Sequence, residues 1–394
     1  MMSVTSPVKD FVERVTAVLG VTEAPLALHE PAFSGNELAY VRECLDTGWV
    51  STAGKFVDEF ESRLAELSGA RHAIAVVNGT AGLHAALHVS GVLAGDEVLV
   101  PTVSFVATAN AVSQCGAVPH FVDCAPDTYG MSPAALAEHL RQVAEPAGGG
   151  FRNRHTGRRL AAIVPMHVFG HPVDIEPLLD LAARYRMPVV EDAAEALGAR
   201  IGDRSAGTFG VAGVLSFNGN KIITTGGGGA VLTNDADVAR RLKHLTTTAK
   251  AAHRWDFVHD EVAFNYRMPN LNAALGCAQL ERLPEILRRK KGLADAYAHA
   301  FADAPDFRFV DEVRGRSSNN WLNAIELSAS MSGRRDEFLE AAREAGYQCR
   351  PVWRLLHRLK PYAACPRMGL SVAESLEQRI INLPSSPQLF REVA

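Results

Sequence analysis

The sequence predicts an α/β fold: a large domain with a mostly parallel sheet between helices, and a smaller C-terminal domain. Length and composition are the first indication, because 394 residues with 47% hydrophobic and 21% charged side chains suit a packed core larger than one small domain. The second is an alternation of short apolar runs with helically spaced apolar residues up to about Asp235. The third is the change after that point to long helices and a mixed region.

Helices are expected before the sheet and between its strands. Apolar residues at helical spacing predict helices over 10–19, 37–45 and 55–67. The runs that predict buried strands are HAIAVV, DEVLVP, PHFVD, LAAIVP, MPVVED, GVLSF and AVLTN. The helices expected between them are TAGLHAALHVSG, SFVATANAVSQCG and DIEPLLDLAARYR. Strands and helices that alternate in this way form a mostly parallel sheet covered on both faces.

The remaining segments complete a prediction of two domains. The glycine- and arginine-rich stretch 144–160 is expected to be a surface insertion. A basic helical stretch and an irregular one follow Asp235, long helices are expected from about Leu271 to Ala302, and a mixed region runs from Arg308 to the end. We therefore expect a large domain over 1–270, including the N-terminal helical segment, and a small domain over 271–394.

Composition excludes several classes of function. Lysine and arginine number 40 and aspartate and glutamate 44, so the formal net charge of −4 argues against a protein built to bind nucleic acid. The cysteines form no CxxC pair and no cluster with histidine at zinc-ligand spacing, so no metal site is expected. Neither a signal peptide nor a membrane-spanning apolar segment is present, so we expect a cytoplasmic protein without membrane partners.

Ligands of parallel sheets bind at the carboxyl ends of the strands, so residues just after each predicted strand are the functional candidates. Gly79 and Thr80 follow the first strand and open a helix, where backbone N–H groups suit a phosphate. A turn capped by Thr80 is the structural alternative. Phe105 follows the second strand and could cover a planar ring, although phenylalanine in a helix usually belongs to a core.

Two charged residues follow later strands. Asp192 ends MPVVED, where a buried carboxylate requires a positive partner or hydrogen bonds, and a helix N-cap is the alternative. Lys221 follows GVLSF and precedes the glycines 226–229. An anion site, an aromatic ring, a carboxylate and a lysine on one sheet edge are together the groups that hold pyridoxal 5′-phosphate. This combination is more specific than any of its members.

Five segments carry a resemblance to a known family: GTAGLHAAL, PTVSFVATANAV, EDAAEALGA, SFNGNKIITTGGGG and FNYRMPNLNAALGCAQL. In this order they resemble the signature segments of the DegT/StrS-type sugar aminotransferases, pyridoxal-phosphate enzymes of fold type I. The resemblance runs from about Glu30 to the last residues. It implies a large domain whose mostly parallel, seven-stranded sheet binds the cofactor, and a smaller C-terminal α+β domain.

The resemblance implies roles residue by residue. Lys221 matches the lysine that binds the cofactor as a Schiff base, Asp192 the partner of the pyridine nitrogen, and Phe105 the aromatic that stacks on the ring. The other matched cofactor contacts are the phosphate ligands Gly79, Thr80 and Ser216, and Glu195 near the ring oxygen, at a position often occupied by glutamine. Asn265 matches an asparagine that completes the phosphate site of the neighbouring subunit. A homodimer with shared active sites is thereby implied.

The sequence departs from the family pattern at two places. Gly227 stands where many relatives have glutamate, so no role of that carboxylate is transferred. Ala263 and Phe264 replace a common Gly-Tyr pair before Asn265, which leaves the local interface open.

The substrate is addressed by shorter resemblances. GWVSTAGKFVDEFE, HVFGHPVD, SFNGNK and NYRMPNLNAALG are most similar to enzymes acting on UDP-linked 4-keto-6-deoxy-N-acetylhexosamines, as in legionaminic-acid pathways. Arg350 and His357 resemble a segment lining the sugar pocket, with a strand end and a helix start as the alternative. Lys250 could meet a nucleotide diphosphate, and a solvated basic loop is at least as good an interpretation.

The function implied by the resemblance is a ping-pong aminotransferase. It would move an amino group from L-glutamate, through pyridoxamine phosphate, to the keto carbon, expected to be C4, of a nucleotide-linked 4-keto-6-deoxy sugar. One rival is a pyridoxal-phosphate-dependent nucleotide-sugar dehydratase, although such relatives generally have histidine where this chain has Lys221. The other is a non-catalytic, pyridoxal-phosphate-binding regulatory protein.

Overall fold

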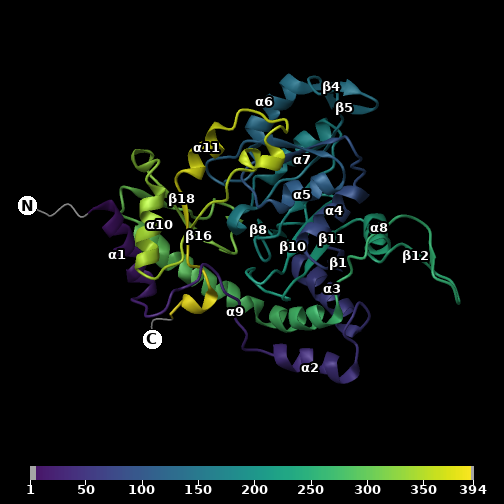
Figure 1. The fold of residues 1–394 in the computed structure, drawn as a ribbon, viewed down its shortest axis with the longest axis horizontal. Helices are drawn as coiled ribbons and strands as arrows, with labels where there is room; N and C mark the ends of the chain where they lie inside the picture. Colours follow the sequence, from purple (N-terminus) through teal and green to yellow (C-terminus); the bar gives the residue numbers. More distant parts are fainter. Residues whose placement is uncertain (1–5, 392–394) are drawn as a thin grey trace, which may run out of the picture.

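The computed structural model describes residues 6–391 and confirms the α/β fold (Figure 1). A four-stranded sheet, β1-β11-β10-β7, and a three-stranded sheet, β3-β2-β6, are joined by β-bridges from Ile163 to Val189 and from Met166 to Asp192. They form one sheet of 4 + 3 = 7 strands. In spatial order these are β1 (His72–Val76), β11 (Gly229–Thr233), β10 (Ala212–Ser216), β7 (Val190–Asp192), β6 (Leu160–Ile163), β2 (Glu97–Pro101) and β3 (Val118–Val122). Each strand corresponds to one of the predicted apolar runs.

Strand β11 runs against the others in this sheet. It pairs antiparallel with both β1 and β10, whereas the pairs β10–β7, β2–β3 and β2–β6 are parallel. All residues of β2, β6, β7 and β11 are buried, as expected for a sheet covered on both faces. The parallel strands end at one edge, and the residues that follow them meet there.

Most helices around the large sheet are close to predicted ones. These are α2 (Glu37–Thr47), α3 (Lys55–Ser68), α4 (Gly79–Val89), α5 (Ala107–Gln114), α7 (Ile175–Arg184) and α8 (Ala236–Thr246), whereas α6 (Pro133–Val143) was not predicted. The expectation that Phe105 lies within a helix is wrong, because α5 starts only at Ala107. Phe105 belongs to the turn before α5, and its carbonyl oxygen accepts a hydrogen bond from the N–H of Thr108. Its side chain is 51% exposed. It is therefore free of the core and available to a ligand.

The stretch 144–160, expected to be a surface insertion, forms a β-hairpin. Its strands are β4 (Ala144–Ala147) and β5 (Gly150–Asn153). The hairpin is anchored to the sheet by Glu97, the first residue of β2, whose carboxylate accepts hydrogen bonds from Asn153 at 2.9 Å and from the Thr156 hydroxyl. A buried carboxylate thus obtains the partners it requires from the hairpin.

One continuous helix, α9 (Asn270–Phe301), replaces the several long helices expected there, and Pro284 lies inside it. The C-terminal part of α9 packs on the C-terminal sheet β14-β16-β18-β17 and on α1 (Pro7–Leu19). The remaining elements of this region are β14 (Phe307–Phe309), β16 (Asn323–Leu327), α10 (Arg335–Glu344), β17 (Arg350–Pro351), α11 (Ser371–Glu377) and β18 (Ile380–Leu383). Phe11 of α1 packs against Phe301 and Phe338, so the N-terminal helix joins the C-terminal core. The domain division at 270 stays a prediction.

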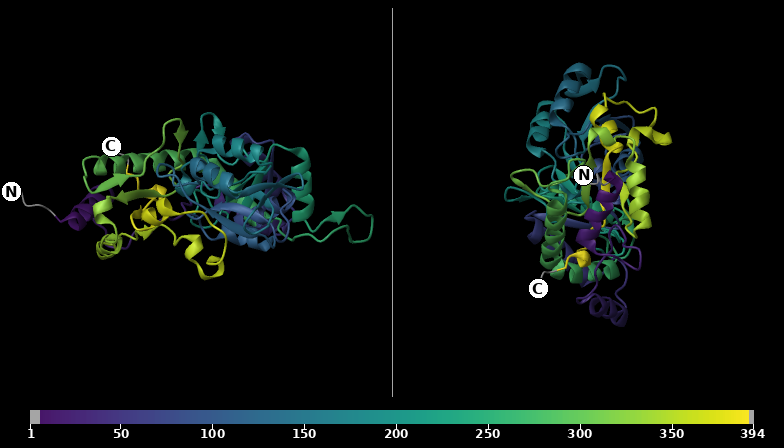
Figure 2. Two further views of the ribbon diagram at one scale, coloured as in Figure 1. Left: turned by 90° about the horizontal axis from the view of Figure 1, so that it is seen from above. Right: turned by 90° about the vertical axis from the view of Figure 1, so that its left-hand side faces the viewer.

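A long hairpin projects from the body of the molecule (Figures 1 and 2). Its strands are β12 (Lys250–Ala251) and β13 (Val258–His259), and its side chains include Trp255 and Phe257, which are 76% and 79% exposed. A small sheet of β8 (Arg200–Ile201), β9 (Arg204–Ser205) and β15 (Arg316–Ser317) completes the fold. Between residues 6 and 391, no helix combines the length and the apolar character needed to cross a bilayer.

Candidate active site

A cavity of about 280 Å³ lies at the carboxyl edge of the large sheet. It is formed by the start of α4, the turns after β2, β7 and β10, and two tryptophans from later in the chain. The sequence-predicted residues that line it are Gly79, Thr80, Phe105, Asp192, Glu195, Ser216 and Lys221. Folding therefore brings most of the predicted cofactor contacts into one cavity.

Lys221 reaches the cavity from the turn after β10. Its Nζ lies 3.3 Å from Oε1 of Glu195 and 3.9 Å from the ring centre of Trp321. The amine is held between a carboxylate and an aromatic face, and 13% of the side chain is exposed. A primary amine held in this way can form a covalent link to a carbonyl carbon that enters the cavity.

Asp192 ends β7 and is buried at the floor of the cavity. Its Oδ2 accepts a hydrogen bond of 2.6 Å from the Thr108 hydroxyl, and its Oδ1 accepts one of 3.2 Å from the N–H of Ala194. Burial raises the pKa of Asp192, and these hydrogen bonds and the charge of Lys221 only partly offset it. Both donors are neutral, so a cationic group in contact with this carboxylate would stabilise its charged form.

The start of α4 forms the anion-binding end of the cavity. Asn78 caps this helix by accepting the N–H of Ala81 at 2.8 Å, so the alternative in which Thr80 is the cap is wrong. Thr80 instead lies in the first turn and lines the cavity, near the positive end of the helix dipole. A Cβ on Gly79 would lie 3.2 Å from the Cβ of Ser216, so a residue without a side chain lets the helix start approach β10 closely.

The glycines after Lys221 have different physical roles. A Cβ on Gly229 would lie 2.7 Å from the backbone of Asn78 and Gly79, so only glycine allows β11 to pack against the start of α4. A Cβ on Gly227 would meet no atom within 4 Å, and this residue lines the cavity. The glycines thus combine a packing requirement with open space beside the ligand.

Glu195 is fully enclosed by the cavity wall. Burial raises its pKa to about 7, against the lowering effect of Lys221 and of the Phe169 N–H, which donates to Oε2 at 2.9 Å. The carboxyl group therefore changes protonation close to neutral pH and can act as donor or acceptor toward a ligand.

Glu195→Gln is expected to make the stability of the cofactor-free protein less dependent on pH. In the unfolded chain this carboxyl titrates near its usual value of 4.5, and in the folded protein near 7. The folded state thus binds the proton more tightly, so wild-type stability falls as the pH rises from about 4.5 to 7. The substitution removes that loss, at most roughly 3 kcal/mol above pH 7. Denaturant unfolding between pH 4 and 8 measures it, with the exposed Glu66→Gln as control. Parallel wild-type and variant curves would contradict it.

The sequence did not single out several residues of the cavity. Trp321 contacts Lys221 from the chain just before β16. Trp353, after β17, was indicated only because the run 350–353 resembles a segment lining the sugar pocket. Thr108 holds Asp192 from within α5. These residues do not follow a strand of the large sheet, so their position in the sequence gave no signal.

Four predicted site residues lie outside this cavity. Asn265 and Lys250 are exposed, at the base and in the first strand of the projecting hairpin, and the Nζ of Lys250 lies 4.1 Å from the ring centre of Phe257. Arg350 is exposed in β17. His357 is buried, with Nδ1 2.8 Å from the Thr102 hydroxyl, so it lies near the end of β2. Roles for these four in substrate or partner binding stay predictions.

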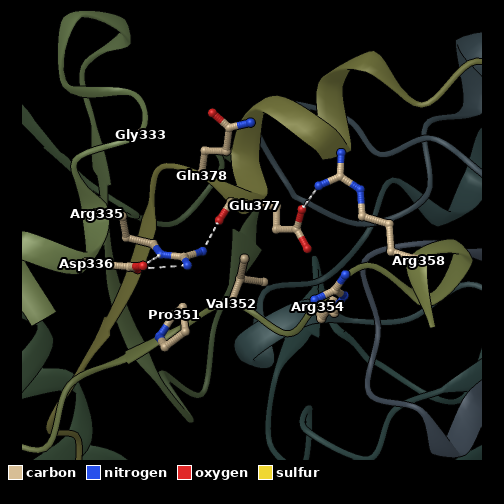
Figure 3. A pocket seen from close by; sticks show the side chains of 9 residues that line it. All are labelled: Gly333, Arg335, Asp336, Pro351, Val352, Arg354, Arg358, Glu377 and Gln378. Carbon is tan, nitrogen blue, oxygen red and sulfur yellow. Dashed lines mark hydrogen bonds and ion pairs between the residues drawn. The ribbon is translucent and has the colours of Figure 1, made fainter. Parts of the chain in front are cut away.

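Two other groups of residues resemble binding sites, one for an anion and one for a metal ion. A cleft of about 350 Å³ between α10, α11 and the segment after β17 is lined by three arginines (Figure 3). Two of them are paired, Arg335 with Asp336 and Arg358 with Glu377, so little charge remains for an anion. On the surface, His244, Asp260 and Glu261 bring possible metal-ligand atoms within 4.8 Å of one another, but Arg241 already pairs with Glu261.

The fold and the cavity define the class of the protein: a pyridoxal-phosphate-dependent aminotransferase of fold type I. The chain belongs to the DegT/DnrJ/EryC1/StrS aminotransferase family, whose family model matches residues 31–394. It is therefore a sugar aminotransferase, as the resemblance of the sequence segments indicated.

Individual relatives are similar over almost the whole chain. GDP-perosamine synthase of Caulobacter vibrioides is 37% identical over 91% of this chain and 93% of its own. EpsN of Bacillus subtilis, provisionally named a pyridoxal phosphate-dependent aminotransferase, is 35% identical over 93% of this chain and 92% of its own. The solved structure of DesI in the presence of its TDP-sugar product is 30% identical and superposes with a TM-score of 0.82 over 94% of this chain and 91% of that one.

Proposed function

We propose that this protein transfers an amino group from L-glutamate to the C4 keto carbon of a nucleotide-linked 4-keto-6-deoxy sugar. The observation that carries the proposal is one cavity shared by the Lys221 amine, the Asp192 carboxylate and the start of α4, in a chain of this family. An amine, an acid and an anion site are the minimum set for pyridoxal-phosphate chemistry on a substrate that also enters the cavity.

The residues of the cavity fit pyridoxal phosphate at three points. Asp192 is buried, its hydrogen-bond donors are neutral, and burial raises its pKa. A protonated ring nitrogen beside it would stabilise the charged carboxylate. The start of α4, with Thr80 and Ser216, would hold the phosphate group. Lys221 reaches the same cavity and would bind the aldehyde carbon, with Phe105 placed to cover the ring.

When bound, the cofactor supplies an electron-withdrawing ring that stabilises negative charge on the carbon that loses its proton. Asp192, fixed by Thr108, would keep the ring nitrogen protonated. The Lys221 amine, once displaced by the amino donor, would take the α proton of glutamate as a general base. In the second half-reaction the same amine would deliver a proton to C4 of the sugar. Glu195, whose Oε1 lies 3.3 Å from the Lys221 Nζ, would hold that amine within the cavity for both transfers.

Two resemblances favour different nucleotides on the sugar substrate. Short sequence segments are similar to enzymes acting on UDP-linked sugars, whereas the Caulobacter relative, similar over nearly the whole chain, is named for a GDP-linked product. Because similarity over the whole chain weighs more than short segments, we propose a GDP-linked 4-keto-6-deoxyhexose as substrate. The legionaminic-type subgroup is not retained.

The test is to incubate the enzyme with pyridoxal phosphate, L-glutamate and a panel of GDP-, UDP- and TDP-linked 4-keto-6-deoxy sugars. We expect 2-oxoglutarate to be released in step with an amino sugar, and kcat/KM to be at least tenfold higher for the GDP-linked sugar, a difference of about 1.4 kcal/mol. Preference for another nucleotide would overturn the GDP assignment alone. Amination of simple 2-oxo acids only would end the sugar assignment, and loss of a sugar hydroxyl without amination would favour the dehydratase.

We further propose that the active unit is a homodimer. Asn265 is exposed outside its own cavity, and the adjoining hairpin presents Trp255 and Phe257 to solvent. Exposed aromatic side chains on a projecting element are typical of an interface, and a second copy could bring Asn265 to the phosphate end of a neighbouring cavity. Mixing Asn265→Ala with an inactive Lys221 variant tests whether two copies share active sites, and recovery of activity in the mixture would support this. A monomer by light scattering would exclude the dimer.

A further inference from the structure

Helix α9 carries a buried lysine behind the active-site cavity. Lys290 is 0% exposed, and its Nζ donates hydrogen bonds to two backbone carbonyl oxygens, those of Trp321 at 3.1 Å and of Ser385 at 2.5 Å. Burial lowers its pKa well below the usual value, and in the part of the chain from 6 to 391 no carboxylate offsets that effect. The amine is therefore buried at a cost in free energy.

The burial cost and the two hydrogen bonds of Lys290 act in opposite directions on stability. A methionine of similar length would fill the space without burying an amine, but it would leave two backbone carbonyl oxygens without this donor. What methionine could not do is donate to the two carbonyl groups. Because carbonyls of irregular segments have no ladder partner, the lysine fixes where these two backbone segments run.

One of these segments leads directly to the catalytic lysine. The face of the Trp321 ring lies 3.9 Å from the Nζ of Lys221, and its Nε1 donates to the Asn220 carbonyl at 2.6 Å. Trp321 thus contacts the turn that carries Lys221 through its side chain, while Lys290 holds its backbone.

The other segment, at Ser385, connects the Lys290 amine to the C-terminal sheet β14-β16-β18-β17. The N–H of Ser385 donates to the Leu28 carbonyl at 2.7 Å, and its hydroxyl accepts the N–H of Asn323 at 2.8 Å. Lys290 therefore joins the segment before β16 to the segment after β18. The segment after β18 is in turn hydrogen-bonded to the chain at Leu28. Two stretches distant in sequence thus meet at one amine on α9, and a third, at Leu28, is joined to them through Ser385.

We propose that Lys290 is a positioning residue for the aminotransferase reaction: by fixing the Trp321 backbone it keeps the indole face against the Lys221 amine. This role rests on the proposed function only in naming Lys221 as the reacting amine. An aromatic face stabilises a cation beside it, so the position of Trp321 affects how readily the nitrogen of Lys221 carries a proton. The other titratable groups acting there are Glu195, Asp192 and the buried His29.

The test is Lys290→Met in the enzyme loaded with pyridoxal phosphate, with Lys291→Met as the matched control. Lys291 is the next residue of α9, but it is exposed and paired with Asp295. In the Lys290→Met enzyme we expect the pH midpoint of the visible absorption change of the Lys221-bound cofactor to fall by about half a unit, because the cation loses part of its aromatic partner. We expect kcat to fall about tenfold with the KM for glutamate within twofold. The control should match the wild type in all three.

A double-mutant cycle separates positioning from a general effect on packing. If Lys290 acts through Trp321, then Trp321→Phe lowers the midpoint and adding Lys290→Met produces no further shift. Additive shifts, or an unchanged midpoint in Lys290→Met, would overturn the proposal. A rise in the midpoint would also overturn it, because that result would mean that Lys290 acts as a nearby positive charge. Should Lys290→Met fail to fold, Trp321→Phe alone still tests the proposal, because an unchanged midpoint in that variant would mean that the indole face does not affect the Lys221 nitrogen.

The midpoint also keeps this test independent of the proposed substrate. A wild-type enzyme that binds pyridoxal phosphate but aminates no keto sugar would end the proposed function. The spectral midpoints of the variants would still decide whether Lys290 positions Trp321.

Discussion

Lys221→Ala is expected to abolish transamination and the covalent attachment of pyridoxal phosphate, with the fold retained. Lys221 is the lysine that lines the cavity, so the substitution removes both the group that binds the aldehyde and the carrier of the proton. Proton transfer by a positioned side chain alone contributes about 10²- to 10⁴-fold, so we expect turnover to fall by more than about 10⁴. Glutamate consumption measures the loss. Borohydride reduction followed by peptide mass spectrometry locates the attachment.

Two further variants sharpen the Lys221 experiment. Lys221→Arg keeps a positive charge beside Glu195 but cannot form a Schiff base, so it should be as inactive as the alanine variant. Lys291→Ala removes an exposed lysine on α9 and should leave both attachment and activity unchanged. A reduced cofactor adduct that persists in Lys221→Ala would show that another lysine carries the cofactor. The assignment of the catalytic residue would then be lost.

Asp192→Asn is expected to lower kcat by about 10²- to 10³-fold while the protein stays folded and still binds pyridoxal phosphate covalently. The amide cannot stabilise a protonated ring nitrogen, so the ring loses much of its electron-withdrawing power. The hydrogen bonds around the site can be kept, because the Thr108 hydroxyl, which also lies 2.6 Å from the Ser104 hydroxyl, can accept as well as donate. Single-turnover reaction with glutamate, followed by absorbance, measures the chemical step directly.

The stability of Asp192→Asn provides an internal check with a definite sign. Burial raises the folded-state pKa of Asp192, so the wild-type carboxyl favours folding below its unfolded-state pKa and loses that contribution as the pH rises through the folded-state value. The cofactor-free variant should therefore be no less stable than the wild type at pH 7, and the exposed Asp203→Asn should change neither activity nor stability. Equal kcat in Asp192→Asn and wild type would remove Asp192 from the mechanism.

Local patterns in the sequence were sufficient for the large sheet. Its strands are buried on both faces, so each is a run of apolar residues that stands out from the helices around it. Element ends were predicted less well. The start of α5 after Phe105 depends on a turn, and the single helix α9 runs through Pro284 because residues on both sides of the proline pack into cores. Both are decided by tertiary contacts rather than by propensity.

The candidate site divides in the same way. Lys221, Asp192 and Gly79 follow strands of one parallel sheet, and parallel strands end at one edge, so their order along the chain was enough to predict that they meet. The surroundings of the amine were decided only by folding, because Trp321 and Lys290 come from segments with no strand-end signal. Trp321 lies against Lys221, and Lys290 of α9 holds the Trp321 backbone from behind. A residue's type and local spacing establish what chemistry it can offer, whereas its solvation and its partners depend on chain segments that become neighbours only in the folded protein.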